Sequence, residues 1–226
     1  KKLVDFALDE RTKAIGQRSL KHQNINSIIV PKNLEMILDF AFFNANIVEI
    51  LIPNDVLLGH SCFQCSVINN IFLNTTSVSE KCFESATVKN IKLKNTKTID
   101  IESFCRAEIT KIIFPDTLEI IKENAFSRAA FRENVLELPK NLKTIEANAF
   151  SNVSGLKKII LPENLEYLSP SFLDSKKVKI VCDEETISRF PFLTLMNTEI
   201  IGIDYFLKQH MTFKEINAAY NRAQER

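Results

Sequence analysis

Residues 156–172 read LKKIILPENLEYLSPSF, and this stretch decides the fold. Its first part has the two-residue period of a short strand, because the apolar pair Ile159 and Leu161 alternates with outward positions. Pro162 follows and ends the strand, since proline has no N–H to donate to a hydrogen-bonded ladder. The next two leucines and Phe172 predict a return segment whose apolar side chains turn inward.

The same pattern recurs along the chain. Copies begin near residues 3, 25, 47, 68, 88, 109, 133 and 156, which gives about eight units of roughly 20–24 residues. Because so small a unit cannot bury its own apolar side chains, the units must stack into a quasi-one-dimensional solenoid. We therefore predict one parallel β-sheet on the concave side, and irregular or short helical segments on the convex side.

Two neighbouring positions of the return segment vary little between units. One is a phenylalanine, at Phe42, Phe63, Phe83, Phe104, Phe126, Phe150 and Phe172. The residue before it is small, at Ala41, Cys62, Cys82, Ser103, Ala125, Ala149 and Ser171. A large side chain at this small position would push neighbouring coils apart, because protein interiors are close-packed. We expect the phenylalanine rings to stack from coil to coil.

The pattern L-x-x-I-x-L-P-x-x-L-x-x-I-x-x-x-A-F resembles the BspA-like class of leucine-rich repeats, over roughly residues 3–177. The resemblance implies a right-handed leucine-rich repeat solenoid. It also implies a surface or secreted protein of a bacterium or parasitic protist that acts in adhesion or host contact. The chain departs from the class at one position. Many relatives carry Gly after the second Ile, where this chain has Leu38, Lys122 and Glu146.

The repeat divides the chain into a solenoid, residues 1–177, and a C-terminal capping segment, residues 178–226. Val178–Cys182 reads as a final strand. Farther on, Thr212–Glu215 has the form of a capping box and begins an amphipathic helix. We expect this helix to cap the apolar end of the solenoid. The alternative is a separate partner-binding helix, which would require the apolar face around Ile216 to be exposed.

Composition excludes several classes of function. Lys and Arg total 29 and Asp and Glu total 28, for a net charge of +1, so nothing favours nucleic acid or an anionic membrane as partner. No apolar run of about 18 residues is present, so we expect no membrane insertion. The N-terminal residues also lack the apolar stretch of a signal peptide. Only four glycines occur, too widely spaced for a phosphate-binding loop.

The five cysteines could be zinc ligands, free structural thiols or members of a disulfide. They are Cys62, Cys65, Cys82, Cys105 and Cys182. His60, Cys62 and Cys65 resemble half of a zinc site, but the other two histidines lie near opposite ends of the chain. The repeat places Cys62 and Cys82 at the small interior position, where we expect free structural thiols. The alternative is a disulfide between these two, one coil apart, if the compartment is oxidising.

We expect no enzymatic activity, no catalytic residues, no metal and no cofactor. A nucleophilic pair of His60 and Cys62 lacks an Asp or Asn to orient the imidazole. The acidic run that begins at Asp183 reads as a solvated turn or a helix start, not as an acid–base pair. With no Trp, three His and four Gly, the chain offers little material for a catalytic pocket.

The outward strand position just before the last apolar residue predicts a binding surface. Along the units it is occupied by Ala7, Ile29, Leu51, Phe72, Lys92, Ile113, Glu137 and Ile160. Contiguous exposed apolar side chains tend to mark interaction sites. We predict that a partner strand or helix binds this concave stripe through Ile29, Leu51, Phe72, Lys92, Ile113 and Ile160, with Glu49 and Lys92 at its rim. One alternative is that these residues only reflect the preference of strands for β-branched and aromatic side chains. Another is that the C-terminal segment covers the stripe.

The sequence thus predicts a protein–protein interaction module, monomeric, whose partner is another protein. By the family resemblance we expect a cell-surface or secreted adhesion protein. The alternative is an intracellular, cytoplasmic scaffold or regulatory protein, which the unpaired cysteines and the missing leader segment favour.

Overall fold

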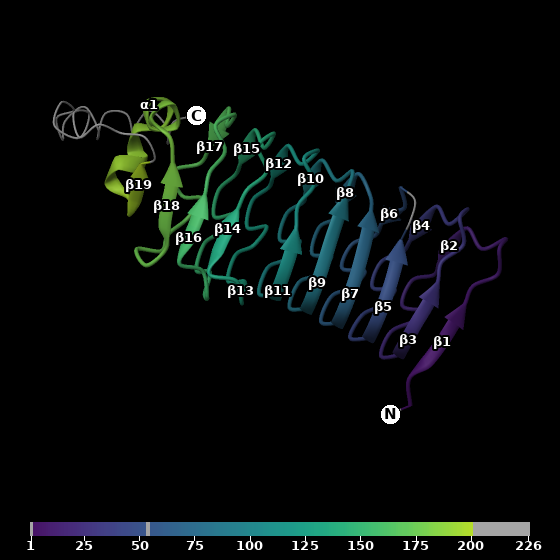
Figure 1. Cartoon of the computed structure of the whole chain (residues 1–226). Coiled ribbons are helices and arrows are strands. Elements are labelled where there is room, and N and C mark those ends of the chain that lie inside the picture. Colours follow the sequence, from purple (N-terminus) through teal and green to yellow (C-terminus); the bar gives the residue numbers. More distant parts are fainter. Residues whose placement is uncertain (1, 53–54, 201–226) are drawn as a thin grey trace.

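A computed structural model describes residues 2–52 and 55–200. Every strand pairing in this part of the chain is parallel, and partners belong to successive repeats, as in the pairing of Ile47 with Ile68 and of Ile68 with Val88. The chain therefore winds as a parallel-strand solenoid, with the N-terminus at one end and the last described coil at the other (Figure 1). This confirms the repeat-solenoid fold predicted from the sequence.

The longer strands form one face of the solenoid, here named the strand face. Seven of them make a continuous sheet in the order β1-β3-β5-β7-β9-β11-β13. Their bounds are Val4–Ala7, Asn24–Ile29, Asn46–Ile52, Val67–Asn74, Thr87–Lys94, Glu108–Ile113 and Ala130–Phe131. A separate four-stranded sheet continues this face with β14 (Val135–Glu137), β16 (Lys158–Ile160), β18 (Lys179–Cys182) and β19 (Thr198–Ile200).

Proline sets the length of these strands. Strand β3 ends two residues before Pro31, and β11 ends two residues before Pro115. Strands β7 and β9, whose units have no proline at this position, each extend to 8 residues. A proline at this point would remove a donor from the ladder, so β7 and β9 pair over a longer distance than β3 and β11.

A second set of parallel ladders runs along another side of each coil. It consists of two-residue strands, labelled along the upper edge of Figure 1. Three of them form one sheet, β2 (Ala14–Ile15), β4 (Met36–Ile37) and β6 (Leu57–Leu58). Five form another, β8 (Ser77–Val78), β10 (Thr98–Ile99), β12 (Ile120–Ile121), β15 (Thr144–Ile145) and β17 (Tyr167–Leu168). The sequence did not predict these sheets as separate elements.

The return segments are irregular turns, one of the two forms expected for them. Seven repeats have a pair of non-glycine residues at positive φ four positions apart, such as Phe40 and Asn44 (56° and 52°). Between the two, the backbone N–H of Phe42 donates to the carbonyl of Cys62 in the next coil at 2.8 Å. The turns thus replace intrahelical hydrogen bonds by bonds from coil to coil, which satisfies their buried backbone groups.

Six of the seven recurring phenylalanines form the predicted spine. The rings of Phe42, Phe63, Phe83, Phe104, Phe126 and Phe150 stack in succession, with centroid distances of 4.8 to 5.2 Å and interplanar angles of 2–7°. All are fully buried, and so are the alanines and cysteines that precede them. Because the rings are parallel and one coil apart, each phenylalanine packs mainly against its equivalents in neighbouring repeats.

The strand face is interrupted between β13 and β14. Residues 132–134 separate these strands, and the next coil follows the detour with Gly155 at a φ of +84°. A β-carbon on Gly155 would approach the carbonyl oxygen of Phe131 to 1.8 Å. Only glycine allows the two coils to come together here, because it combines a positive φ with the absence of a side chain.

The last described coil partly fits the expected cap. The predicted final strand is present as β18, and the acidic run begins helix α1 (Glu184–Arg189), whose N-cap Asp183 accepts a hydrogen bond from the N–H of Thr186 at 2.7 Å. A short 3₁₀ helix, η1 (Pro191–Leu195), buries Phe192 against the core. The helix predicted after Thr212 lies outside the described residues. Both of its predicted roles, capping the solenoid and binding a partner, therefore stay predictions.

Candidate functional site

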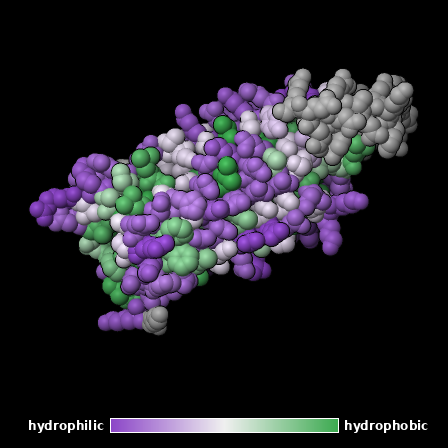
Figure 2. All heavy atoms as spheres, turned by 180° about the vertical axis from the view of Figure 1, so that it is seen from behind, coloured by the Kyte–Doolittle hydropathy of each residue, from purple (hydrophilic) through white to green (hydrophobic). Residues whose placement is uncertain are grey.

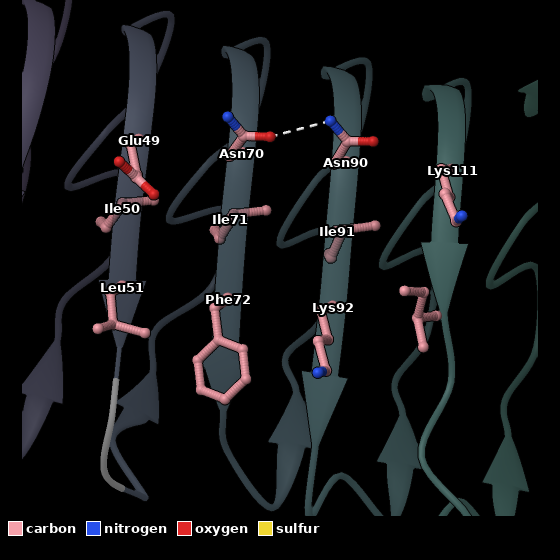
Figure 3. A pocket seen from close by; sticks show the side chains of 11 residues that line it. Glu49, Ile50, Leu51, Asn70, Ile71, Phe72, Asn90, Ile91, Lys92 and Lys111 are labelled. Carbon is pink, nitrogen blue, oxygen red and sulfur yellow. Dashed lines mark hydrogen bonds between the residues drawn. The ribbon is translucent and has the colours of Figure 1, made fainter.

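Two rows of outward side chains cross the strand face, because side chains alternate along each strand. The first row is Glu49, Asn70, Asn90 and Lys111, paired in register from β5 to β11. The second row is Leu51, Phe72, Lys92 and Ile113, also in register. Buried isoleucines such as Ile71 lie between the rows and point into the core (Figure 3).

The second row is largely apolar and exposed. Ile29 of β3 is 65% exposed, Leu51 is 51% exposed and Ile113 is 43% exposed. Phe72 lies half-buried between them, and the ammonium of Lys92 is 6.0 Å from the centroid of its ring. The residues from Ile29 to Ile113 are named here the apolar stripe. Ile29, Leu51 and Phe72 are apolar side chains on three successive strands, and they form a patch of the kind that marks protein-binding surfaces.

A hollow of about 370 Å³ lies between the two rows. Leu51, Phe72, Lys92 and Ile113 line one side, and Glu49, Asn70, Asn90 and Lys111 line the other (Figure 3). Of the polar row, only Glu49 was assigned to the binding surface from the sequence. The signal that could have identified Asn70, Asn90 and Lys111 is strand alternation. Each lies two positions before a residue of the apolar stripe on the same strand, and therefore on the same face of the sheet.

The charges of this region are not paired within the solenoid. Across residues 2–52 and 55–200, Glu49, Lys92 and Lys111 make no ion pair. Asn70 accepts a hydrogen bond from the amide of Asn90 at 2.9 Å, which fixes the middle of the row. A negative side chain on β5 and positive side chains on β9 and β11 are therefore available to a partner.

Not all of the predicted stripe is contiguous. Ile160 lies in the second sheet, where it pairs with Glu137 and Val181, and it is half-buried. The interruption after β13 separates it from Ile113. The structure thus brings Ile29, Leu51, Phe72, Lys92 and Ile113 together, with Glu49 beside them, and leaves Ile160 apart.

The side of the molecule opposite the strand face is mostly hydrophilic, and some of its charges are paired between coils. Hydrophilic side chains cover most of the surface seen from behind, with hydrophobic residues in small groups among them (Figure 2). Ion pairs link neighbouring coils on the turns, for example Lys81 with Glu102 at 3.3 Å and Lys122 with Asp100 at 2.7 Å. The hydrogen bonds to Glu102 and to Asp100 raise the pKa of the two lysines. These charges already have partners within the solenoid.

The cysteines are all free. Cys62 and Cys82 are fully buried, with their sulfur atoms 3.3 Å apart. His60 lies near Glu80, 3.6 Å from its carboxylate, and no cluster of three or more metal-ligating side chains exists in the part of the chain that the structure describes. No helix within the same residues is both long and apolar enough to cross a membrane.

One comparison with known proteins, that with family models, agrees with the repeat. The family described as "BspA type Leucine rich repeat region" matches residues 1–105 and 76–201 with six copies. No curated protein sequence matches the chain. The crystal structure of the pneumococcal vaccine antigen PcpA is similar over 88% of this chain and 79% of its own, with 17% sequence identity and a TM-score of 0.33. Since the family matches nearly all of the solenoid, the chain belongs to the BspA-type leucine-rich repeat family.

Proposed function

We propose that the chain is a non-enzymatic protein-interaction module that binds a partner protein along the apolar stripe. The observation that carries this proposal is the exposure of Ile29 and Leu51 on neighbouring strands, and of Ile113 farther along the same continuous sheet. Extended sheet surfaces are the usual binding sites of leucine-rich repeat solenoids. Burying such side chains against a partner releases water from apolar surface, which is the main favourable contribution to protein association.

The dimensions of the stripe favour a helical segment of the partner. Neighbouring strands lie about 4.8 Å apart, whereas one helical turn rises about 5.4 Å. A helix laid across the strands would therefore present roughly one side chain per coil. Apolar residues of its buried face would contact Leu51 and Phe72, and a basic residue toward β5 and an acidic residue toward β11 would meet Glu49 and Lys111.

Membership of the family supports location at the cell surface or outside the cell, and a role in adhesion or host contact. An intracellular scaffold is the second candidate, and the five free cysteines favour it, because thiols persist in reducing compartments. Both candidates use the same binding surface, and a solenoid of this type is typical of interaction modules and not of enzymes.

A comparison of three proteins tests the proposal. The first is the unaltered chain, and the second carries Ile29→Glu, Leu51→Glu and Phe72→Glu. The third is a matched control with Leu57→Glu, Ile101→Glu and Tyr167→Glu, which places the same charges on exposed apolar residues off the strand face. Circular dichroism checks that all three are folded, and quantitative affinity capture from surface extracts of host cells measures binding.

The proposal predicts a partner that the unaltered chain and the control retain equally and that the stripe variant loses at least tenfold. Equal capture by all three proteins would contradict it. Loss of the partner in the control alone would place binding outside the strand face. A reaction product formed from the captured partner would argue for an enzyme.

A further inference from the structure

Cys62 and Cys82 occupy the same position in successive coils. Each precedes a phenylalanine of the stacked spine, and the N–H of Phe63 donates to the carbonyl of Cys82 at 2.9 Å. This bond holds the two turns in register. Both side chains are fully buried, and their sulfur atoms are in contact at 3.3 Å.

The backbone is already placed for a covalent bond. Hydrogen-bonded neighbours in stacked parallel segments lie about 4.8 Å apart, inside the range of about 4.4–6.8 Å that disulfides span between Cα atoms. A bonded pair needs the sulfur atoms to approach to about 2.05 Å, which a side-chain rotation can supply without displacing the coils. Among the described residues, none of the other three cysteines is hydrogen-bonded to a second cysteine.

We propose that Cys62 and Cys82 are an oxidation site and form an intercoil disulfide when the chain folds in an oxidising compartment. The oxidant is the disulfide of a thiol–disulfide oxidoreductase or of a small molecule such as oxidised glutathione. One cysteine thiolate attacks this disulfide and releases the first thiol. The second cysteine then attacks the mixed disulfide, releases the second thiol and closes the bond. Two protons leave the cysteines, and two electrons reduce the oxidant.

Burial determines when this reaction takes place. Desolvation raises the pKa of the Cys62 thiol well above its ordinary value, and the neighbouring Cys82 raises it further. The attacking thiolate is therefore scarce once the coils have stacked, and an oxidoreductase cannot reach a fully buried sulfur. The bond is thus expected to form while these coils assemble, and to resist reductants once the solenoid is complete.

The repeat itself supplies matched control variants. Ala41, Ala125 and Ala149 occupy the equivalent buried position in other coils, so alanine at Cys82 keeps the packing while removing the thiol. Cys65, three residues after Cys62, is the nearest competing thiol along the chain before the coils have stacked. Its equivalent in the next coil is Ser85, which has nearly the same φ (57° and 56°), so Cys65→Ser removes the competitor without straining the turn.

The experiment is oxidative refolding of the full chain. The Cys65→Ser protein is refolded in a buffer of oxidised and reduced glutathione, alkylated under denaturing conditions and digested with trypsin. Cleavage after Lys32, Lys81 and Lys89 places Cys62 in peptide 33–81 and Cys82 in peptide 82–89. The proposal predicts a cross-link between these two peptides. The cross-link is absent when the added Cys82→Ala substitution removes one thiol.

Thermal unfolding gives a second readout. The disulfide closes a loop between residues 20 positions apart, so the oxidised protein should unfold about 6–10 °C higher than the reduced one. The Cys82→Ala variant should show no such difference. Full alkylation of both cysteines after oxidative refolding would overturn the proposal, and so would a cross-link of either cysteine to Cys105 or Cys182. Neither outcome affects the binding proposal, because both cysteines lie in the return turns.

Discussion

The carbonyl oxygen of Phe131 occupies the space that a β-carbon at Gly155 would need, since the two would lie only 1.8 Å apart. This close approach joins the coil that carries β13 to the next one, at the point where the long sheet is interrupted. The contact between these two residues therefore sets how closely the two coils approach each other at this point.

Replacing Gly155 should strongly destabilise the protein. In Gly155→Ala the new methyl group meets backbone atoms of Phe131, and the positive φ adds strain, so we expect a loss of about 3 kcal/mol in the free energy of unfolding. Gly16→Ala is the matched control, because its β-carbon meets only the Ser19 side chain, at 3.7 Å. The control should change stability by no more than about 0.5 kcal/mol. Urea unfolding followed by circular dichroism measures both, and equal stability of the two variants would contradict the assignment.

Truncating the phenylalanine spine should cost more than truncating the strand face. Phe104 is fully buried and stacks on both Phe83 and Phe126 at 5.0 Å, so Phe104→Ala should lose about 3–5 kcal/mol through lost burial and the resulting cavity. Phe72 is the control on the strand face, where Phe72→Ala should cost less than about 1 kcal/mol. The same urea titration compares them, and a reversed order would show that Phe72 belongs to the core.

The interruption of the strand face predicts where binding stops. Leu51→Glu should weaken binding of a partner at least tenfold, because it places a charge in the middle of the apolar stripe. Ile160→Glu should change binding less than about twofold, because its strand belongs to the other sheet. Titration calorimetry with the captured partner measures both. Comparable losses would mean that the partner spans both sheets.

The C-terminal coil should respond to acid through Glu199. Hydrogen bonding to Lys179, with further attraction from Lys158, lowers the pKa of this carboxyl group from 4.5. Since the folded pKa is depressed, the contribution of Glu199 to stability is present above about pH 4.5 and is lost as the pH falls through the lower, folded value.

The comparison with Glu199→Gln isolates this effect. The unaltered chain should have the higher urea midpoint at pH 7, by a small amount because both partners are exposed, and the difference should disappear near pH 3. A difference that persists in acid would assign the role of Glu199 to hydrogen bonding instead of charge.

The repeat pattern predicted the elements that depend on apolar spacing. The strands, the inward isoleucines and the stacked phenylalanines all follow from side chains that must be buried, and burial leaves a clear signal in sequence. The exposure of Ile29 and Leu51 also followed from the strand alternation. Their role in binding stays a prediction.

The features that were not predicted depend on the backbone. Phe40 and Arg106 adopt positive φ although neither residue type favours it, because the hydrogen bonds to the next coil impose the turn. The two-residue ladders were also missed, since a pair of residues carries no measurable period. Gly16 and Gly59 follow the short strands β2 and β6, at the position where the family often has glycine. Leu38, Lys122 and Glu146 occupy that position in other coils.

The interruptions of the two ladders do not coincide. The short-strand ladder is broken between β6 and β8, where β5 and β7 pair over six residues, and the long-strand ladder is broken after β13, where β12 and β15 remain paired. Between any two neighbouring coils of the described residues, at least one of the two ladders is therefore hydrogen-bonded without a break. A force along the solenoid axis meets no boundary between coils at which both ladders are interrupted. Under such a force, the solenoid should therefore unfold from its ends, coil by coil, and not separate in the middle.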